Sequence, residues 1–131
     1  MNVFLDENLP VALCSHLVHP GVNVQVLKIL MGGIPAVTDV EIMEFIGTKY
    51  CGQRNILLTR DREMTRRIQE VAEWRKRDIC LVVLSGNLPQ TRSAILFAFI
   101  SSIWPGVIAR LLADPAIHLV RITEKGIIKA R

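Results

Sequence analysis

The chain has 131 residues, a net charge of +4, 50% hydrophobic residues and 21% charged residues. This length corresponds to one domain with one hydrophobic core, and the composition excludes a disordered, collagen-like or low-complexity polypeptide. Three cysteines without a CxxC pair argue against a disulfide framework or a zinc knuckle, and favour a reducing cytoplasm. We therefore expect a single domain over residues 1–131.

The first part of the chain predicts a strand, a helix and a second strand. Asn2 to Leu5 is a short apolar run, and Pro10 stands in the first turn of a helix expected from Leu9 to about Val18. Val22 to Leu27 is rich in β-branched residues and partly alternates with polar ones, which is typical of a strand. Met31 to Pro35 contains two glycines and a proline and is predicted to be a loop.

A capping signal predicts the next helix. Thr38 is followed three residues later by Glu41, the spacing of a capping box, so the helix is expected to begin at Asp39. The next three elements are a buried strand, a helix and another buried strand, namely Asn55 to Thr59, Arg62 to about Trp74, and Ile79 to Leu84. Such continuous apolar runs suit strands that are covered on both faces.

The C-terminal third predicts a helix and a closing hairpin. A strand-to-helix signal at Asn87-Leu88-Pro89 precedes helical residues that continue to about Ala113, with a break expected at Pro105. His118 to Thr123 and Gly126 to Lys129 suggest a β-hairpin. The alternation of strands and helices therefore predicts an α/β domain with a mostly parallel central sheet.

The most apolar stretch bears on location and assembly. Ser93 to Ala109 is an uncharged run of 17 residues, below the ~20 residues that span a bilayer. We interpret it as a buried helix or a subunit interface, and we expect a homodimer with no membrane association. Asp6 and Glu7 interrupt the apolar start, so no signal peptide is expected.

Three acidic residues can meet at one edge of this sheet. Asp6 ends the first strand and Asp61 follows the Asn55 to Thr59 strand by two residues, so parallel strands place both at the same edge. Asp39 begins a helix that can present its carboxylate to that edge. Each acid taken alone is also explained by helix capping or by the helix dipole.

Three convergent carboxylates would require a cation or a proton. Two like charges about 4 Å apart repel by ~1 kcal/mol in water and ~4 kcal/mol at an effective dielectric constant of 20. Carboxylate ligands without histidine or cysteine select a hard ion, Mg²⁺ or Mn²⁺. Such an ion can activate water for attack on a phosphodiester. The acids therefore indicate a metal-dependent phosphodiester hydrolase.

A basic segment adjoins the third acid. Between Arg60 and Arg77 there are seven basic and four acidic residues, a net charge of +3. The candidate contacts to nucleic-acid phosphates are Arg60, Arg62, Arg66 and Arg67. A solvated helix face on which these arginines pair with Glu63 and Glu70 is the alternative interpretation.

Three segments of the chain resemble the signatures of the PIN-like domain family. They are Phe4 to Pro10 (FLDENLP), Thr38 to Ile42 (TDVEI) and Leu57 to Met64 (LLTRDREM). They look most like small bacterial PIN-like proteins that are similar to VapC-type toxins. The resemblance implies a three-layer α/β/α nuclease fold, dependent on Mg²⁺ or Mn²⁺, usually directed at RNA, with a small antitoxin as partner. It also implies that Asp6, Asp39 and Asp61 occupy the metal-site positions, with Glu63 where a second acid often stands.

One departure from the family keeps alternatives open. PIN nucleases usually carry another acid between the first two signatures, but this chain has neither Asp nor Glu between Asn8 and Thr38. Glu7 or Glu41 can take the place of this additional acid, and we take Glu41 as a further metal ligand. We predict a ribonuclease acting as a toxin, with DNA as the other possible substrate. The alternatives are a catalytically weak or inactive RNA-binding protein and a phosphoacceptor receiver domain, although Leu84 to Asn87 lacks the lysine that a receiver domain needs.

Overall fold

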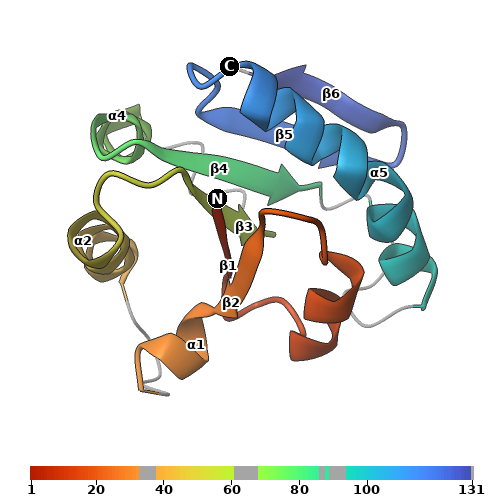
Figure 1. The fold of residues 1–131 in the computed structure, drawn as a ribbon, viewed down its shortest axis with the longest axis horizontal. Helices are drawn as coiled ribbons and strands as arrows, with labels where there is room; N and C mark the ends of the chain where they lie inside the picture. The colour runs from red at the N-terminus through yellow and green to blue at the C-terminus, as the bar shows by residue number, and fades with distance from the viewer. Residues whose placement is uncertain (33–37, 61–67, 86–87, 89–93, 131) are drawn as a thin grey trace.

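A six-stranded sheet forms the centre of the molecule. The structure is a computed structural model, and it describes residues 1–32, 38–60, 68–85, 88 and 94–130. Five strands are parallel and β6 pairs antiparallel with β5, in the order β2-β1-β3-β4-β5-β6 (Figure 1). The strands are β1 Asn2–Leu5, β2 Asn23–Val26, β3 Asn55–Thr59, β4 Ile79–Leu84, β5 Leu119–Thr123 and β6 Gly126–Ala130. The expected α/β class with a mostly parallel sheet is confirmed.

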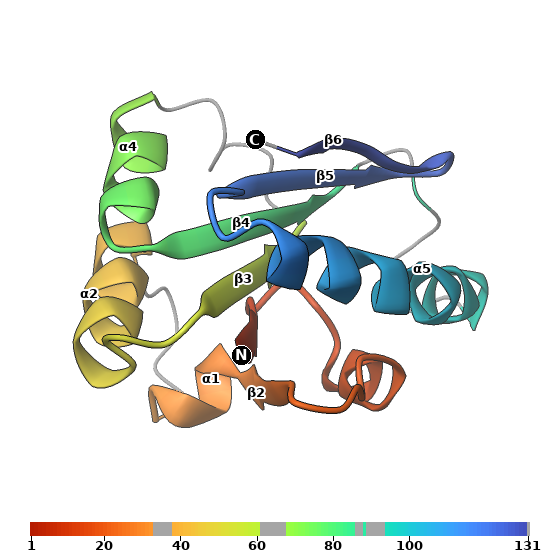
Figure 2. The same ribbon diagram turned by 45° about the horizontal axis from the view of Figure 1, so that its top comes forward.

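Helices cover both faces of the sheet. They are η1 Val11–His16, α1 Leu27–Leu30, α2 Asp39–Lys49, α4 Ile68–Lys76 and α5 Ala94–Ala113, where η1 is a 3-10 helix. Figure 2 shows α2 and α4 at one side of the strands and α5 at the other. Their side chains contribute to two separate apolar cores, one on each face. The helices and the sheet therefore form three layers.

The continuous apolar runs of the strands follow from burial on both faces. In β3, Ile56 and Leu58 belong to the core beneath α5, whereas Leu57 between them belongs to the core beneath α2 and α4. All six residues of β4 are buried. Side chains of a strand point alternately to opposite faces, so a doubly covered strand has no polar side.

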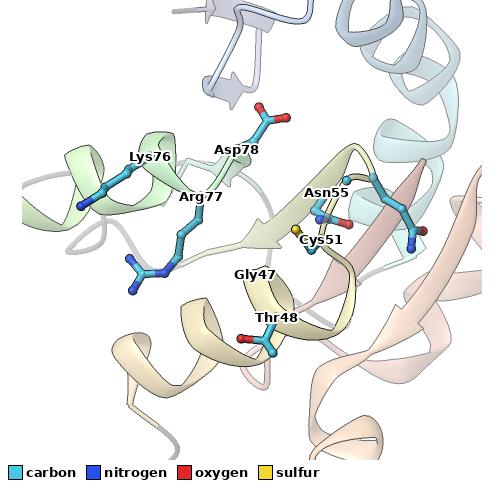
Figure 3. Close-up of a pocket in the computed structure, with 9 residues that line it drawn as sticks. Gly47, Thr48, Cys51, Asn55, Lys76, Arg77 and Asp78 are labelled. Atoms are coloured by element: carbon cyan, nitrogen blue, oxygen red, sulfur yellow. The ribbon is translucent and has the colours of Figure 1, made fainter.

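The core beneath α2 and α4 is closed by aromatic and aliphatic side chains. Phe4 and Trp74 are almost completely buried there, with Met43 and Ile46 of α2. At the amino edge of the sheet, the C-terminal ends of α2 and α4 and the loops that follow them enclose a surface pocket of about 350 Å³ (Figure 3). Its lining residues are Gly47, Thr48, Cys51, Gly52, Gln53, Asn55, Lys76, Arg77 and Asp78.

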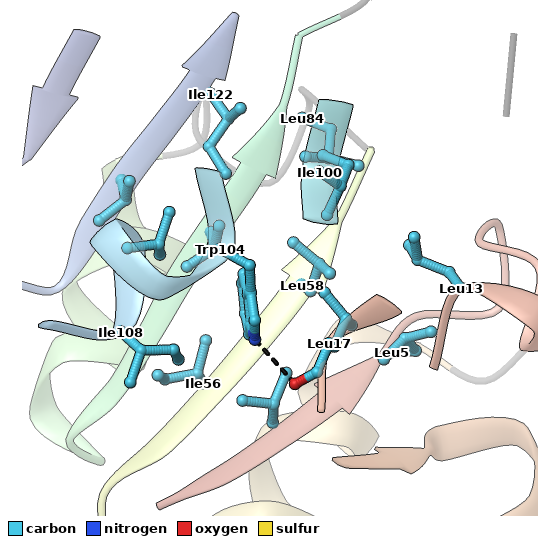
Figure 4. Packing of buried hydrophobic residues seen from close by; sticks show 14 of the residues in the cluster. Leu5, Leu13, Leu17, Ile56, Leu58, Leu84, Ile100, Trp104, Ile108 and Ile122 are labelled. Carbon is cyan, nitrogen blue, oxygen red and sulfur yellow. Dashed lines mark hydrogen bonds between the residues drawn. The ribbon is translucent and has the colours of Figure 1, made fainter. Parts of the chain in front are cut away.

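In the core beneath α5, this helix contacts the segment that follows η1. The Trp104 indole Nε1 donates a hydrogen bond of 2.8 Å to the Leu17 carbonyl oxygen, which links α5 to the segment after η1 (Figure 4). Trp104 is 1% exposed and Leu17 is completely buried. The indole therefore buries its apolar area while its single donor is satisfied.

Several local predictions about the first half of the chain need correction. The helix expected from Leu9 to Val18 is the shorter 3-10 helix η1, in which Leu13 N–H donates to the Pro10 carbonyl, three residues back. Such spacing is stable only over short runs, so the element ends at His16. The Val22 to Leu27 strand covers only Asn23–Val26, because Leu27 begins helix α1, which was not expected. The Asp39 start of α2 is confirmed.

The break expected at Pro105 is wrong. Helix α5 continues through this proline from Ala94 to Ala113. Pro105 lacks an N–H group and leaves the carbonyl of Ser101 without its helical donor. Both residues are exposed, so water can satisfy that carbonyl and the helix does not need to end.

Helix α5 is longer than the uncharged run suggested. It has 20 residues with a mean hydropathy of 1.9 over its most apolar window, and by length and composition alone it could cross a membrane. One third of that window is buried inside the fold. The buried residues, among them Leu96, Ile100 and Trp104, pack on the sheet.

Candidate active site

A buried carboxylate lies at the carboxyl edge of the sheet. Asp6 directly follows β1 and is 5% exposed. One carboxylate oxygen, Oδ2, accepts a hydrogen bond of 2.7 Å from the Thr59 hydroxyl, and Oδ1 accepts one of 2.9 Å from the Glu7 backbone N–H. Both of these donors are uncharged. They fix the orientation of the carboxylate without neutralising it.

The pairing of β1 with β3 explains why Asp6 meets Thr59. These neighbouring parallel strands pair Leu5 with Leu58, and the Asp6 N–H donates to the Leu58 carbonyl at 3.0 Å. One residue further along, Asp6 and Thr59 therefore lie side by side. Thr59 is completely buried, and its hydroxyl donates to the Asp6 carboxylate.

The second acid lies at the start of α2. Asp39 is the first residue of that helix and is partly exposed, while Ile42, Met43 and Ile46 anchor the helix on the sheet face to which Asp6 also belongs by strand alternation. The structure describes no contact between Asp39 and Asp6. Their convergence stays a prediction.

Glu41 takes part in the cap of the same helix. The Thr38 hydroxyl accepts the Glu41 N–H at 3.2 Å and donates to the Glu41 carboxylate at 3.1 Å. The expected capping-box spacing therefore forms a cap. Glu41 itself is exposed.

The third acid and three of the four candidate phosphate contacts lie outside the described residues. These predicted site residues are Asp61, Arg62, Arg66 and Arg67. Arg60 is described, and its guanidinium donates a hydrogen bond of 2.7 Å to the Leu88 carbonyl, which ties the end of β3 to the segment after β4. Within the part of the chain that the structure describes, no three His, Cys, Asp or Glu side chains are grouped so that they could hold a metal ion.

The buried Cys80 and the half-buried Cys14 do not supply a nucleophile. Burial raises the pKa of the Cys80 thiol from 9.0 to about 12, with smaller opposing effects of the Arg54 and Asp78 charges. Burial also raises the pKa of Cys14. Both groups are therefore protonated thiols at neutral pH, and a thiolate mechanism is excluded for them.

Two residues of this edge were missed by sequence reasoning. One is Thr59, although a polar residue that ends an apolar strand close to a candidate acid is a signal that the sequence contains. The other is Arg121 of β5, which pairs with Val83 of β4. It gave no such signal, because its nearness to this edge depends on the long-range order of the strands.

One comparison with known proteins identifies the family of the chain. A family model described as a PIN like domain matches residues 1–86, which include β1 to β4 and the segment of each acid. No curated protein and no solved structure matches the chain. Domains of this family often have nuclease activity and typically depend on divalent metal ions. The phosphoacceptor receiver alternative is thereby set aside. The chain belongs to the PIN-like domain family.

Proposed function

We propose that this protein is a metal-dependent ribonuclease that hydrolyses phosphodiester bonds at the carboxyl edge of its sheet. The observation that carries the proposal is the Asp6 carboxylate, 5% exposed and held by the Thr59 hydroxyl and the Glu7 N–H within a PIN-like domain. A carboxylate is not buried for stability alone, because its desolvation costs free energy. At the end of a parallel strand, a fixed carboxylate is typical of a site.

The donor atoms at Asp6 fit a hard divalent ion. The Asp6 carboxylate oxygens, which accept the Thr59 hydroxyl and the Glu7 N–H, are atoms of the kind that ligate such ions. Oxygen donors favour Mg²⁺ or Mn²⁺. In the proposal, Asp6, Asp39 and Asp61 hold the ion. Glu41 joins them if it exchanges its hydrogen bond to Thr38. The ion, when bound, activates water and offsets the charge that develops on the phosphate.

The residues of the chain have distinct roles in the proposed reaction. Asp6 is proposed to bind the metal ion. Thr59 keeps Oδ2 of Asp6 in one orientation, so Thr59 is a positioning residue. Arg62, Arg66 and Arg67 are proposed to contact flanking phosphates, and Arg60 shares its guanidinium between such a contact and Leu88. The net charge of +4 favours approach of a polyanion.

The direct test is cleavage of single-stranded RNA by the purified protein with Mn²⁺ or Mg²⁺. Asp6→Asn and Asp61→Asn should lower the cleavage rate by on the order of 100-fold or more, because a metal ion contributes several kcal/mol to transition-state stabilisation. Asp114→Asn is the matched control, since Asp114 is exposed in the turn after α5. Mn²⁺ should raise the thermal midpoint of the control but not that of Asp6→Asn. Cleavage that survives both active-site substitutions would overturn the mechanism.

A second candidate function is RNA binding without turnover. It is favoured by the absence of Asp and Glu between Asn8 and Thr38, where PIN nucleases usually carry an acid. This candidate predicts binding that weakens steeply with salt and no metal-dependent cleavage. Clean cleavage by the untagged protein would exclude it.

We further propose that the protein acts in the cytoplasm as a homodimer and as a toxin with a small antitoxin partner. Three cysteines without a disulfide pattern support the compartment. Exposed Ile95 and Leu112 on α5, 72% and 61% exposed, support self-association. Light scattering of the purified protein tests the dimer, and rescue of growth by co-expression of a neighbouring small gene tests the toxin role.

A further inference from the structure

A row of side chains crosses the carboxyl edge of the sheet from an acid to an arginine. The strand register pairs Thr59 with Val83 and Val83 with Arg121, and Asp6 lies beside Thr59. These four residues therefore occupy one level on four neighbouring strands, β1, β3, β4 and β5.

The row also lies on one face of the sheet. Phe4 and Val83 belong to the core beneath α2 and α4, and Leu5 belongs to the opposite core. Because side chains alternate along a strand, Asp6 projects to the face of Phe4, and Arg121 projects to the face of its partner Val83. The carboxylate and the guanidinium thus share both the edge and the face.

Arg121 lines a small pocket at its end of the row. This surface pocket has a volume of about 110 Å³ and is lined by Val83, Ser85, Arg121 and Thr123. None of these four residues is acidic. A guanidinium beside two hydroxyl groups matches the acceptor oxygens of a phosphate, and a partly exposed position leaves the pocket accessible to a ligand.

The spacing of the strands separates this pocket from the proposed reaction centre. Neighbouring strands are about 4.8 Å apart, so Arg121 on β5 lies three strand spacings, about 14 Å, from Asp6 on β1. One phosphate cannot occupy both places. A single-stranded chain that crosses the strand ends can place one phosphate at Asp6 and another at Arg121.

We propose that Arg121, with Ser85 and Thr123, binds a phosphate of the RNA strand other than the one that is cleaved. The inference rests on the proposed ribonuclease function. It defines the substrate class further, because a substrate must carry at least two phosphates to use the whole edge. The protein therefore prefers an oligonucleotide over a dinucleoside monophosphate.

The first experiment measures binding of a single-stranded RNA 12-mer in EDTA, where cleavage does not interfere. Arg121→Gln should weaken binding by about fivefold to tenfold and should lower the magnitude of the salt slope by about 0.7, the contribution of one phosphate contact to a single strand. Arg121→Lys should restore part of the affinity. Arg110→Gln is the matched control, because Arg110 is exposed on α5, the helix that packs on the other face of the sheet.

The second experiment separates a phosphate contact from a structural role. Arg121 and Ser85 also take part in interactions within the folded chain, so thermal midpoints are measured for each variant. With Mn²⁺, Arg121→Gln should lower kcat/KM about fivefold to tenfold on the 12-mer and leave it unchanged on a dinucleoside monophosphate. An equal loss on both substrates would overturn the subsite, as would binding equal to that of Arg110→Gln.

The two proposals fail in different ways. If the unaltered protein binds the 12-mer but never cleaves it, the ribonuclease proposal falls, and a binding loss in Arg121→Gln still supports the subsite. If the unaltered protein cleaves and Arg121→Gln matches it on both substrates, only the subsite is overturned. If the unaltered protein does not bind RNA at all, both proposals are wrong.

Discussion

The two edges of the sheet use polar side chains in different ways. At the amino edge, neutral amides close on one another: Asn2 donates to Gln53 at 2.7 Å and to Asn55 at 3.0 Å, and Asn55 donates to the Tyr50 carbonyl. At the carboxyl edge, the Asp6 carboxylate is fixed by uncharged donors, and Thr59 is one of them. Burial is similar, since Asn2 and Asp6 are both 5% exposed.

The charged groups sharpen the contrast. At the amino edge, Asp78 lies 3.6 Å from the Arg54 guanidinium, so opposite charges meet, and its carboxylate lies 3.1 Å from Nε2 of His118. At the carboxyl edge, the row from Asp6 to Arg121 holds an acid and a base three strands apart. An exposed ion pair such as that of Asp78 with Arg54 stabilises a fold only weakly. Burial of a polar residue at a strand end is therefore not sufficient to identify a site.

The largest effect on stability is expected at the amino edge. Asn55→Ala removes an acceptor from Asn2 and a donor from the Tyr50 carbonyl, and leaves space in a side chain position that is 2% exposed. We expect the free energy of unfolding to fall by about 2–4 kcal/mol, because buried polar groups lose their partners. Urea denaturation measures this change.

A control on the same edge separates the amide network from general surface effects. Gln53→Ala removes the exposed partner of Asn2 and should cost less than Asn55→Ala. Both variants should keep the RNA affinity and the cleavage rate of the unaltered protein at temperatures where they are folded. A tenfold loss of cleavage in Asn55→Ala would mean that the two edges are not separate in function.

The next largest effect concerns the donor to Asp6. Thr59→Val keeps the shape of the side chain and removes the hydroxyl that donates to Oδ2 at 2.7 Å. The free energy of unfolding should fall by about 1–3 kcal/mol. Cleavage should fall about tenfold, or ~1.4 kcal/mol in the barrier, because the carboxylate loses its orientation. Steady-state cleavage and urea denaturation measure the two effects.

Two further variants test whether the hydroxyl itself is responsible. Thr59→Ser keeps the donor and should retain most of the cleavage activity, and Thr48→Val on the exposed side of α2 should change neither quantity. If Thr59→Val cleaves RNA as fast as the unaltered protein while its stability falls, Thr59 has a structural role only.

For some elements, the sequence predicts the first and last residues correctly. The strands β3 and β4 have the predicted bounds, because long aliphatic runs between polar residues have no stable alternative to a doubly covered strand. The helix start at Asp39 was predictable from Thr38 and Glu41, whose interaction is local. Asp6 could be placed at a strand end because the apolar run from Asn2 to Leu5 that precedes it is also a local pattern.

Other features depend on contacts that no local pattern contains. Pro10 indicated that a helix begins nearby, but it did not indicate the hydrogen-bond spacing, which is that of a 3-10 helix. The proline rule failed at Pro105 because the position is exposed, and exposure follows from tertiary packing. Likewise, the bond between Asp6 and Thr59 joins residues 53 positions apart, and the level shared with Arg121 requires the order of four strands.

An intermediate effect on the free energy of unfolding is expected from the buried Cys80 thiol of β4. Burial raises the pKa of Cys80 to about 12 from 9.0, so the folded state holds this proton more tightly than the unfolded state. The stabilising contribution is complete below pH 9 and is lost as the pH rises toward 12. We expect a loss on the order of 1 kcal/mol between pH 9 and pH 10.

Matched cysteine variants isolate this effect. Cys80→Ala should flatten the alkaline part of the stability curve, whereas Cys51→Ala should not, because Cys51 is exposed. A thiol reagent at pH 8 should label Cys51 quickly and leave Cys80 unreacted until the protein unfolds. Rapid labelling of Cys80 in the folded protein would contradict the burial that raises its pKa.

The smallest effect is expected from the ion pairs of the amino edge. Asp78 adopts a positive φ of 56° between α4 and β4, a conformation that asparagine tolerates. Asp78→Asn should therefore remove the charge opposite Arg54 and His118 without straining the backbone, at a cost of about 0.5 kcal/mol, because the Asp78 side chain is 64% exposed. Asp78→Ala should cost about 1 kcal/mol more, since alanine lacks the polar side chain that supports this conformation.

The RNA-binding properties of Asp78→Asn complete the comparison of the edges. The salt slope of RNA binding should equal that of the unaltered protein, in contrast to the decrease expected for Arg121→Gln, because the charge removed at the amino edge faces partners within the fold. Filter binding over a range of salt concentrations measures both slopes. If Asp78→Asn changes the slope as much as Arg121→Gln does, RNA contacts both edges, and the division of the molecule into a structural edge and a binding edge is wrong.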